Sequence, residues 1–255
     1  MRSPISSACG AALLIVAANL PAQGSQQPFR TTQDRAGLWL TYVGEHALND
    51  RWSFLFDGSI RRGEFASVWR SFLVRPALQW QLTPGVRLAT GYAFSYVYPA
   101  GGASGNVHTP EHRIFQQVLL SHTISKVSLS HRYRFENRWF QQTDTAAGGE
   151  HTQSWLKRQR ARYQVKGTFP LGSGRTYLSS FDEIFVNIGA NVRYNVFDSN
   201  RFAAGLGLRL TNTLRLESYY LNYLVLHGDG RGVDRNHVWL TTLNSTQPFR
   251  RSTKQ

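Results

Sequence analysis

The stretch Leu129–Phe140 reads Leu-Ser-His-Arg-Tyr-Arg-Phe-Glu-Asn-Arg-Trp-Phe. Its residues alternate in character, with Arg132, Arg134, Glu136 and Arg138 on one parity and Tyr133, Phe135, Asn137 and Trp139 on the other. Because a strand sends successive side chains to opposite faces, one face is charged and the other is largely aromatic. A soluble sandwich would bury the aromatic face, whereas a membrane barrel would turn it to lipid and the charged face to a polar interior. The rest of the chain decides between the two.

Composition is compatible with a single β-barrel domain. The chain has 255 residues, of which 17% are charged and 13% aromatic. Its mean hydropathy of −0.36 is too polar for a helical membrane protein, but only alternate strand residues of a membrane barrel must be apolar. The net charge of +14 would usually indicate nucleic-acid binding. Here the arginines are spread along alternating strands, so we expect no nucleic-acid partner and a basic surface suited to anionic lipopolysaccharide.

The N-terminus predicts export. Arg2 precedes the apolar run Ala8–Leu20, which is too short to span a bilayer, and Pro21-Ala22 suits a cleavage site. We predict a signal peptide at residues 1–22, with a buried first helix as the alternative. The only cysteine, Cys9, lies inside this segment, so the mature chain would have neither a disulfide nor thiol chemistry.

Alternation of period two begins at Gly37 and recurs almost without a break. Most predicted strands are longer than the about 9–11 residues of a tilted membrane strand and far longer than the about 5–6 residues usual in soluble proteins. We predict eleven segments: Leu38–His46, Arg51–Arg62, Val68–Leu82, Val86–Tyr98, Glu111–Thr123, Lys126–Phe140, Trp155–Phe169, Arg175–Asn187, Arg201–Thr211, Leu214–Leu226 and Arg235–Thr246. The barrel would occupy residues 37–247, between a polar linker at 23–36 and a basic tail at 248–255.

Connections between these segments alternate between short turns and longer polar loops, which is typical of outer-membrane barrels. Eleven is an odd number, whereas bacterial single-chain barrels have an even number of strands. We therefore expect one strand to have been missed or miscounted, near residues 27–35 or 188–201. The predicted fold class is all-β: a single antiparallel up-and-down transmembrane β-barrel of about 12 strands, with 10 as the alternative.

Aromatic residues gather near strand ends, where a membrane interface satisfies both an apolar ring and a polar N–H or O–H. They are Trp39, Trp52, Trp69, Trp80, Tyr98, Trp139, Trp155 and Trp239.

The charged parity of the strands supplies a candidate polar network inside the barrel. Charges in such a lumen must pair or be hydrated. The simpler interpretation is a salt-bridged lumen that holds the wall together, and the sharper one is an anion-selective path or a ligand pocket lined by arginine. The candidates are Arg75, Glu111, Arg113, Arg132, Arg134, Glu136, Arg138, Arg160, Arg162, Glu183, Arg209, Arg215 and Glu217.

Catalytic, metal-binding and cofactor motifs are not found in the sequence. It has no H-E-x-x-H, no paired cysteines and no acidic calcium loop, so we expect no cofactor, no metal and no enzymatic activity. The pairs Ser121-His122 and Ser130-His131 could serve a lipid hydrolase only loosely. Neighbours on a strand point to opposite faces, so neither pair can form a nucleophile–base contact within itself.

A series of short motifs lies along the chain: Glu111-His112-Arg113, Arg132–Arg138, Arg160-x-Arg162-Tyr163, Phe169-Pro170-Leu171, Asp182–Asn187, Phe197–Arg201 and Leu216-Glu217-x-x-Tyr220. With these motifs the chain resembles, over roughly Gly37–Leu243, the domain of unknown function 2490 family of exported bacterial proteins, many described as outer-membrane β-barrels. The resemblance implies an outer-membrane location and a barrel fold, and it carries no catalytic residues.

The expected function is that of a non-enzymatic barrel in the bacterial outer membrane, structural or a small channel with an arginine-rich lumen. One alternative is an outer-membrane lipid-modifying enzyme, an acyl hydrolase. Another is a soluble periplasmic β protein that binds an acidic ligand. The expected partners are outer-membrane lipid, lipopolysaccharide and the barrel-assembly machinery.

Overall fold

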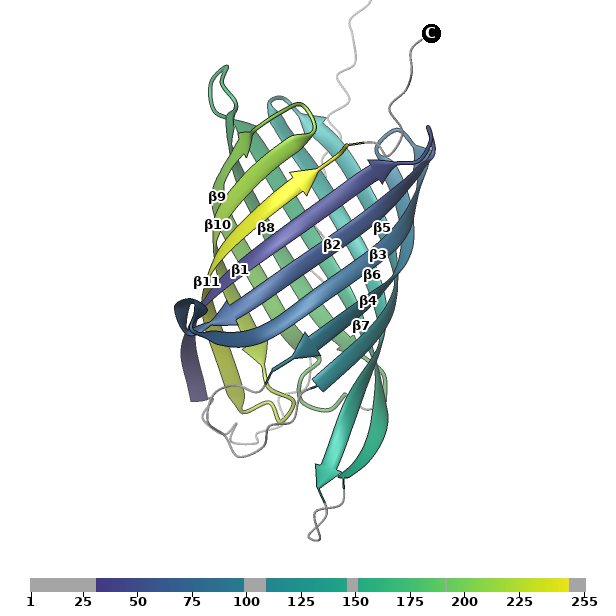
Figure 1. The fold of residues 1–255 in the computed structure, drawn as a ribbon, viewed down its shortest axis with the longest axis vertical. Coiled ribbons are helices and arrows are strands. Elements are labelled where there is room, and N and C mark those ends of the chain that lie inside the picture. The colour runs from purple at the N-terminus through teal and green to yellow at the C-terminus, as the bar shows by residue number, and fades with distance from the viewer. Residues whose placement is uncertain (1–30, 99–108, 146–150, 191, 248–255) are drawn as a thin grey trace, which may run out of the picture.

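One closed β-barrel of eleven strands makes up the structure, a computed structural model that describes residues 31–98, 109–145, 151–190 and 192–247 (Figure 1). The strands range from 12 to 20 residues. No helix in the described ranges has the length and apolar character to cross a membrane. The predicted signal peptide at residues 1–22 and the basic tail at 248–255 lie outside the described residues.

Each of the eleven predicted segments coincides with one observed strand. The largest difference is at the first strand, which begins at Thr31 and includes residues expected to belong to the polar linker. The strands are β1 (Thr31–Ala47), β2 (Trp52–Gly63), β3 (Val68–Thr83), β4 (Val86–Val97), β5 (Thr109–Ile124), β6 (Val127–Thr145), β7 (His151–Pro170), β8 (Thr176–Ile188), β9 (Phe197–Arg209), β10 (Leu214–Leu226) and β11 (Gly232–Ser245).

The barrel closes through a parallel ladder between β1 and β11, from Thr31 opposite Gly232 to Gly44 opposite Ser245. All other neighbouring strands are antiparallel. The predictions of 12 or 10 strands are therefore wrong, because eleven strands close the barrel within the described residues. An up-and-down chain with an odd number of strands ends in the direction in which it began, so its edges can only pair in parallel. That pairing is slightly weaker per residue, and here it is long and free of register shifts.

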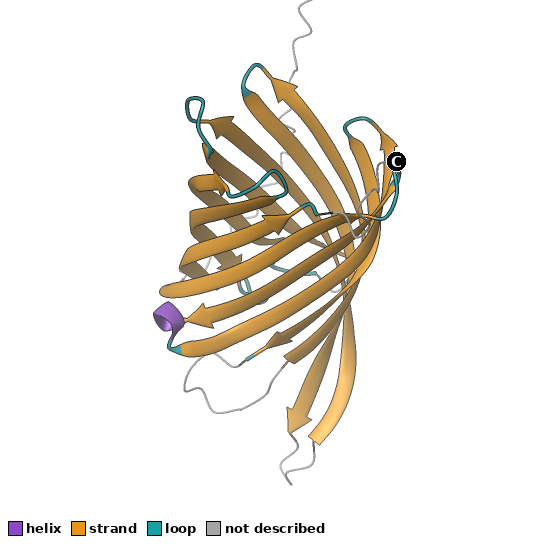
Figure 2. Cartoon of the chain, turned by 45° about the horizontal axis from the view of Figure 1, so that its top comes forward, coloured by secondary structure: helices purple, strands orange, loops and turns teal. Residues whose placement is uncertain are grey.

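The two ends of the barrel differ, as predicted from the alternating connections. Turns of at most five residues join the strands at one end, which we call the short-turn end, and the two longest connections, between β4 and β5 and between β8 and β9, lie at the other, the long-loop end (Figure 2). At the first tight turn the Asn49 Oδ1 accepts hydrogen bonds from the N–H groups of Arg51 and Trp52, both at 2.9 Å. At the long-loop end the β6–β7 hairpin extends past its neighbours (Figure 1).

The faces of the wall are inverted relative to a soluble protein. Large apolar side chains such as Ile114 and Leu206 point outward and are exposed, whereas Glu136 and Glu183 point inward and are 1% and 2% exposed. Aromatic pairs lie toward both ends of the outer wall, with Trp52 against Trp80 at the short-turn end. The predicted interfacial place of Trp39 is wrong, because this residue faces the lumen and is buried.

Candidate functional site: a charged waist and an arginine-lined vestibule

A network of five charged side chains lies inside the barrel on three neighbouring strands, β6, β7 and β8, and we call it the waist: Arg132, Glu136, Arg160, Arg162 and Glu183. The Glu136 carboxylate accepts hydrogen bonds from Arg160 Nη2 and Arg162 Nη1, both at 2.6 Å. Arg162 Nη2 also reaches Glu183 Oε1 at 2.7 Å, and Arg132 Nη2 reaches the same oxygen at 2.9 Å. Each carboxylate therefore receives two guanidinium groups, the arrangement that a buried charge requires.

Strand register explains why these residues meet. Glu136 on β6 lies directly opposite Arg160 on β7, and both belong to the inward parity of their strands. Asp198, at the start of β9, extends the network through Arg160 Nη1 at 2.8 Å. The ring of Phe185 lies beneath the guanidinium groups of Arg160 and Arg162, whose Cζ atoms are 5.0 and 4.5 Å from its centroid. Apart from Arg132 and Asp198, which are partly exposed, these inward groups are nearly inaccessible to solvent, so side chains pack closely inside the barrel at this level.

Other predicted lumen residues pair in smaller groups. Glu111 binds Arg113 at 2.6 Å and Arg138 at 2.5 Å, so it too receives two guanidinium groups. Arg134 donates to the amide oxygen of Gln117 through Nη2 at 2.5 Å.

Two predicted residues have partners that the sequence did not indicate. Arg75 pairs with Asp57 of β2 at 2.9 Å. Glu217 pairs with Lys166 at 2.8 Å and accepts a hydrogen bond from the Tyr177 hydroxyl at 3.0 Å.

Besides Arg134, two of the predicted network residues are not part of any ion pair among the described residues. Arg209 packs its guanidinium over the Tyr177 ring, 5.5 Å from the centroid. Arg215 is exposed to solvent near the short-turn end. The inward parity of both residues is as predicted, but the carboxylate on the same face of β10, Glu217, pairs with Lys166 instead.

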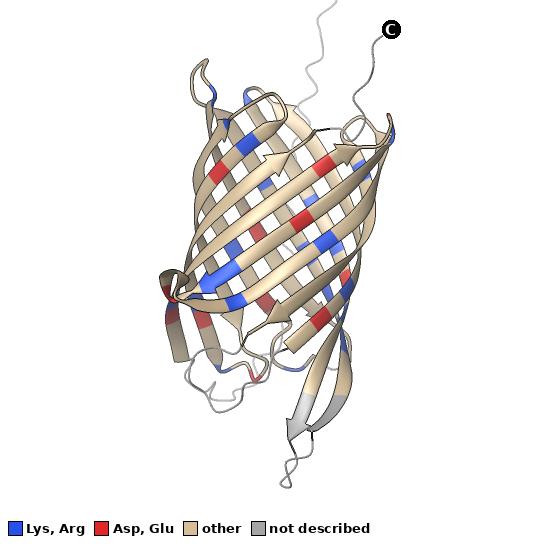
Figure 3. Ribbon diagram, in the orientation of Figure 1, with Lys and Arg blue, Asp and Glu red and all other residues tan. Residues whose placement is uncertain are grey.

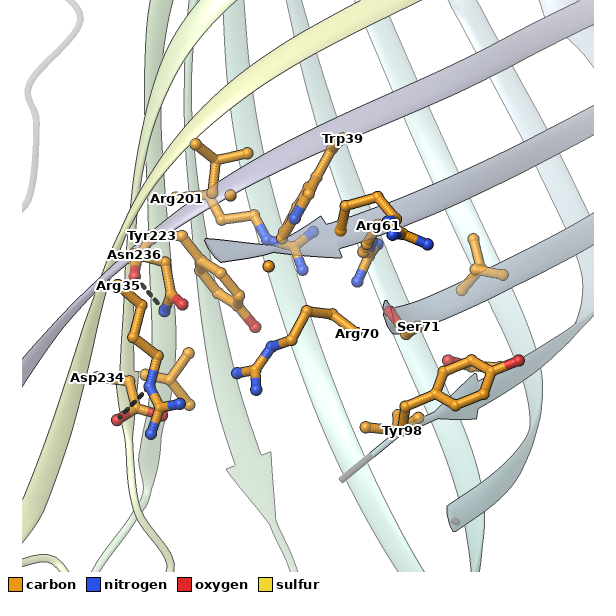
Figure 4. A pocket seen from close by; sticks show the side chains of 18 of the residues that line it. Arg35, Trp39, Arg61, Arg70, Ser71, Tyr98, Arg201, Tyr223, Asp234 and Asn236 are labelled. Carbon is orange, nitrogen blue, oxygen red and sulfur yellow. Dashed lines mark hydrogen bonds and ion pairs between the residues drawn. The ribbon is translucent and has the colours of Figure 1, made fainter. Parts of the chain in front are cut away.

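A cavity of about 1120 Å³ lies at the long-loop end of the lumen, and we call it the vestibule. Most small-molecule sites have a volume of about 300–1,000 Å³, so this cavity is larger than most. Ten arginines and four carboxylates line it, so the positive charge is in excess (Figures 3 and 4). They are Arg35, Arg61, Arg62, Arg70, Arg75, Arg113, Arg138, Arg160, Arg162 and Arg201, with Asp34, Glu64, Glu111 and Asp234.

Sequence reasoning missed the arginines that set this vestibule apart, namely Arg61, Arg70 and Arg201. A signal for two of them was present in the alternation. Arg61 shares its parity with Asp57 on β2, and Arg201 shares its parity with the buried Ser199 and Ala203 on β9. Arg70 gave no such signal, because it precedes the regular inward alternation of β3 that begins at Ser71.

The outer wall shows how the serine–histidine pairs are arranged. The Ser121 hydroxyl accepts a weak hydrogen bond from Arg87 Nη2 inside the barrel, at 3.4 Å, whereas His122 stacks on His131 outside, with centroids 5.3 Å apart. Opposite orientation within the pair is thus confirmed. His131 Nδ1 lies 2.9 Å from the Tyr163 hydroxyl. The part of the chain that the structure describes holds no group of three residues able to bind a metal ion.

The fold and the lumen define a class of protein: a closed β-barrel with an apolar outer wall and a charged interior. Within that class, the chain belongs to the family described as Protein of unknown function (DUF2490), whose model matches residues 36–233. The family resemblance is therefore confirmed. No curated protein and no solved structure matches the chain.

Proposed function

We propose that this protein is a non-enzymatic β-barrel of the bacterial outer membrane. Its apolar outer wall would be solvated by lipid, its lumen is closed by the waist, and its vestibule would open to the cell exterior. The observation that carries the proposal is the inversion of the two faces of the wall, which holds around the whole barrel.

Every strand contributes an exposed large apolar or aromatic side chain to the outer wall. A soluble monomer seldom exposes an apolar patch larger than a few hundred Å², whereas lipid tails would solvate such a ring of side chains. These residues include Leu40, Ile60, Leu78, Tyr92, Ile114, Tyr133, Trp155, Ile184, Leu206, Tyr220 and Trp239, one from each strand in order. This ring favours the membrane over a soluble periplasmic protein.

Polar side chains such as Gln116 and Asn137 also lie on the outward parity, and Asp182 is an acidic example. Asp182 lies on the outward parity near the middle of β8, and its Oδ1 accepts a hydrogen bond from Asn200 Nδ2 at 2.5 Å. A carboxyl facing lipid is costly, and the neighbouring amide supplies a partner in place of water.

The filled waist favours a structural barrel over an open channel. Side chains can fill a barrel of about 8 strands, whereas barrels of about 16–18 strands leave an aqueous channel. With eleven strands this barrel is near the lower limit, and its inward arginines are long. We therefore expect no more than a small conductance.

Fractionation of cells that express the native chain tests the membrane location. The protein is expected in the outer-membrane fraction, resistant to SDS until heated, with a shift on the gel after boiling. Recovery as a dissolved monomer without detergent would contradict the proposal.

Planar bilayers test the closed lumen. The folded protein is expected to give little or no conductance. Large, steady conductance from the unmodified chain would show that the waist does not close the lumen.

A further inference from the structure

We infer that the vestibule is a binding site for a phosphorylated ligand, held by three residues that we call the open arginines: Arg61, Arg70 and Arg201. This assignment concerns the interior of the barrel, so it can be tested in detergent, whichever membrane the barrel occupies.

The open arginines lack the close carboxylates that neutralise the waist. Within the described residues Arg61 and Arg70 form no ion pair, and the carboxylate oxygen nearest to Arg201 is Glu183 Oε2 at 3.9 Å. The Glu183 carboxylate already receives three shorter hydrogen bonds from Arg132 and Arg162, all at its other oxygen, Oε1. In addition, Arg61 and Arg201 each hold a buried Nε–H without a hydrogen-bond acceptor. An unsatisfied buried donor costs free energy that a bound acceptor would recover.

The open arginines come together in space although they lie on β2, β3 and β9. The guanidinium carbons of Arg61 and Arg201 lie 4.2 and 5.2 Å from the ring centroid of Trp39. Arg201 also lies over the ring of Tyr223, at 4.4 Å. Arg70 lines the same cavity from β3 and points into it (Figure 4). Cations held close together by aromatic rings repel each other, and an anion between them removes that repulsion.

The chemistry of the lining favours phosphate over a single carboxylate. A phosphoryl group offers three acceptor oxygens and up to two negative charges, so several guanidinium groups can bind it from different directions. The vestibule is much larger than a phosphate ion. It therefore leaves room for an attached polar group, such as a sugar, beside the aromatic rings and the polar side chains of Ser71 and Asn236. The phosphate could be carried by a soluble ester or by a lipid headgroup.

Calorimetric titration of the full-length mature protein in detergent tests the assignment. Pyrophosphate and glucose 1-phosphate are expected to bind saturably, and glucose is not. The double variant Arg61→Gln/Arg201→Gln is expected to weaken binding of both phosphates at least tenfold. The control variant Arg209→Gln removes one positive charge at the other end of the lumen and should leave the affinity within twofold. A heat shift on SDS gels verifies that each variant is folded.

Three outcomes would overturn the inference. They are the absence of saturable phosphate binding at millimolar concentration, equal weakening by Arg209→Gln, and glucuronate binding as tightly as glucose 1-phosphate.

A second titration, with micelles of phosphorylated and dephosphorylated lipid A, distinguishes a lipid headgroup from a soluble ester as the source of the phosphate. Tighter binding of phosphorylated lipid A than of glucose 1-phosphate would assign the site to a headgroup, and the reverse would assign it to a soluble ester. A folded barrel without phosphate binding would refute this inference alone.

Discussion

The waist and the vestibule are built from the same wall and the same type of side chain, yet they differ in pairing. In the waist, Glu136 and Glu183 each receive two guanidinium groups within 2.9 Å. In the vestibule, ten arginines but only four carboxylates line the cavity, and the open arginines have no close acidic partner in the described part of the chain. The difference shows that the placement of carboxylates, rather than of arginines, separates a structural region from a binding region.

The closing seam is what brings the open arginines together. In the order of strands around the barrel, β2 and β3 lie on one side of the β1–β11 seam, and β10 and β9 on the other. Across this seam Trp39 of β1 meets Tyr223 of β10 edge to face, with centroids 5.6 Å apart. The aromatic support for Arg61 and Arg201 therefore depends on the parallel closure.

The largest expected effect follows from breaking the waist. In Glu136→Gln the carboxylate shared by Arg160 and Arg162 is lost, so each of these buried guanidinium groups loses one of its two acidic partners. Removing one partner of a buried ion pair costs about 3–5 kcal/mol. The urea midpoint of the folded band on unheated gels should fall accordingly. An unchanged midpoint would show that water already reaches the waist.

A phosphate ligand should stabilise the folded protein through the vestibule rather than through the waist. At a concentration one hundred times its dissociation constant, a ligand that binds only the folded state adds about 2.7 kcal/mol to the free energy of unfolding. Glucose 1-phosphate should therefore raise the urea midpoint of the native chain and leave that of Arg61→Gln/Arg201→Gln unmoved. An equal rise in both proteins would indicate a general ionic effect.

A substitution at the rim of the vestibule should raise the free energy of unfolding, by less than Glu136→Gln lowers it. The turn Glu64–Ala66 has three consecutive residues with positive φ, and Ala66 has a φ of 88°. Such a conformation costs an L-residue about 1–2 kcal/mol, and glycine relieves it at some cost in chain entropy. Ala66→Gly should raise the free energy of unfolding by about 1 kcal/mol, measured by the same urea titration. A loss of stability would show that the turn is not strained.

The smallest effect is expected for Arg61→Gln. Its cation–π contact with Trp39, worth about 0.5–1 kcal/mol, is lost, but repulsion from Arg201 is lost as well. The free energy of unfolding should change by less than about 1 kcal/mol. A loss as large as that of Glu136→Gln would mean that Arg61 is paired like the arginines of the waist, and the contrast between the two regions would fail.

Alternation and segment length were enough to predict the eleven strands, the order of short and long connections and most of the waist. Those features depend on parity within a strand, which the sequence shows directly. The strand count was wrong because the closure of a barrel depends on contacts between the first and last strands. Nothing in Thr31–Ala47 alone distinguishes a parallel partner from an antiparallel one.

The vestibule was harder to predict for a related reason. Arg61 and Arg201 are distant in sequence, and only their register across several strands shows that both lie beside Trp39. Trp39 itself was expected at the membrane interface, because its position near a strand end resembles that of the outward tryptophans. Parity with the buried inward residues of β11, such as Leu240 opposite it, explains why it faces the lumen instead.

The central claim is that lipid contacts the outward parity of the wall, and a spin-label scan along β10 in lipid bilayers tests it most directly. Single cysteines would replace residues 216–224 in a chain that carries Cys9→Ser. The outward positions 216, 218, 220, 222 and 224 should be more accessible to oxygen than to a water-soluble nickel chelate, and the positions between them should be shielded from oxygen. High nickel accessibility at the outward positions, or the absence of alternation, would contradict the account.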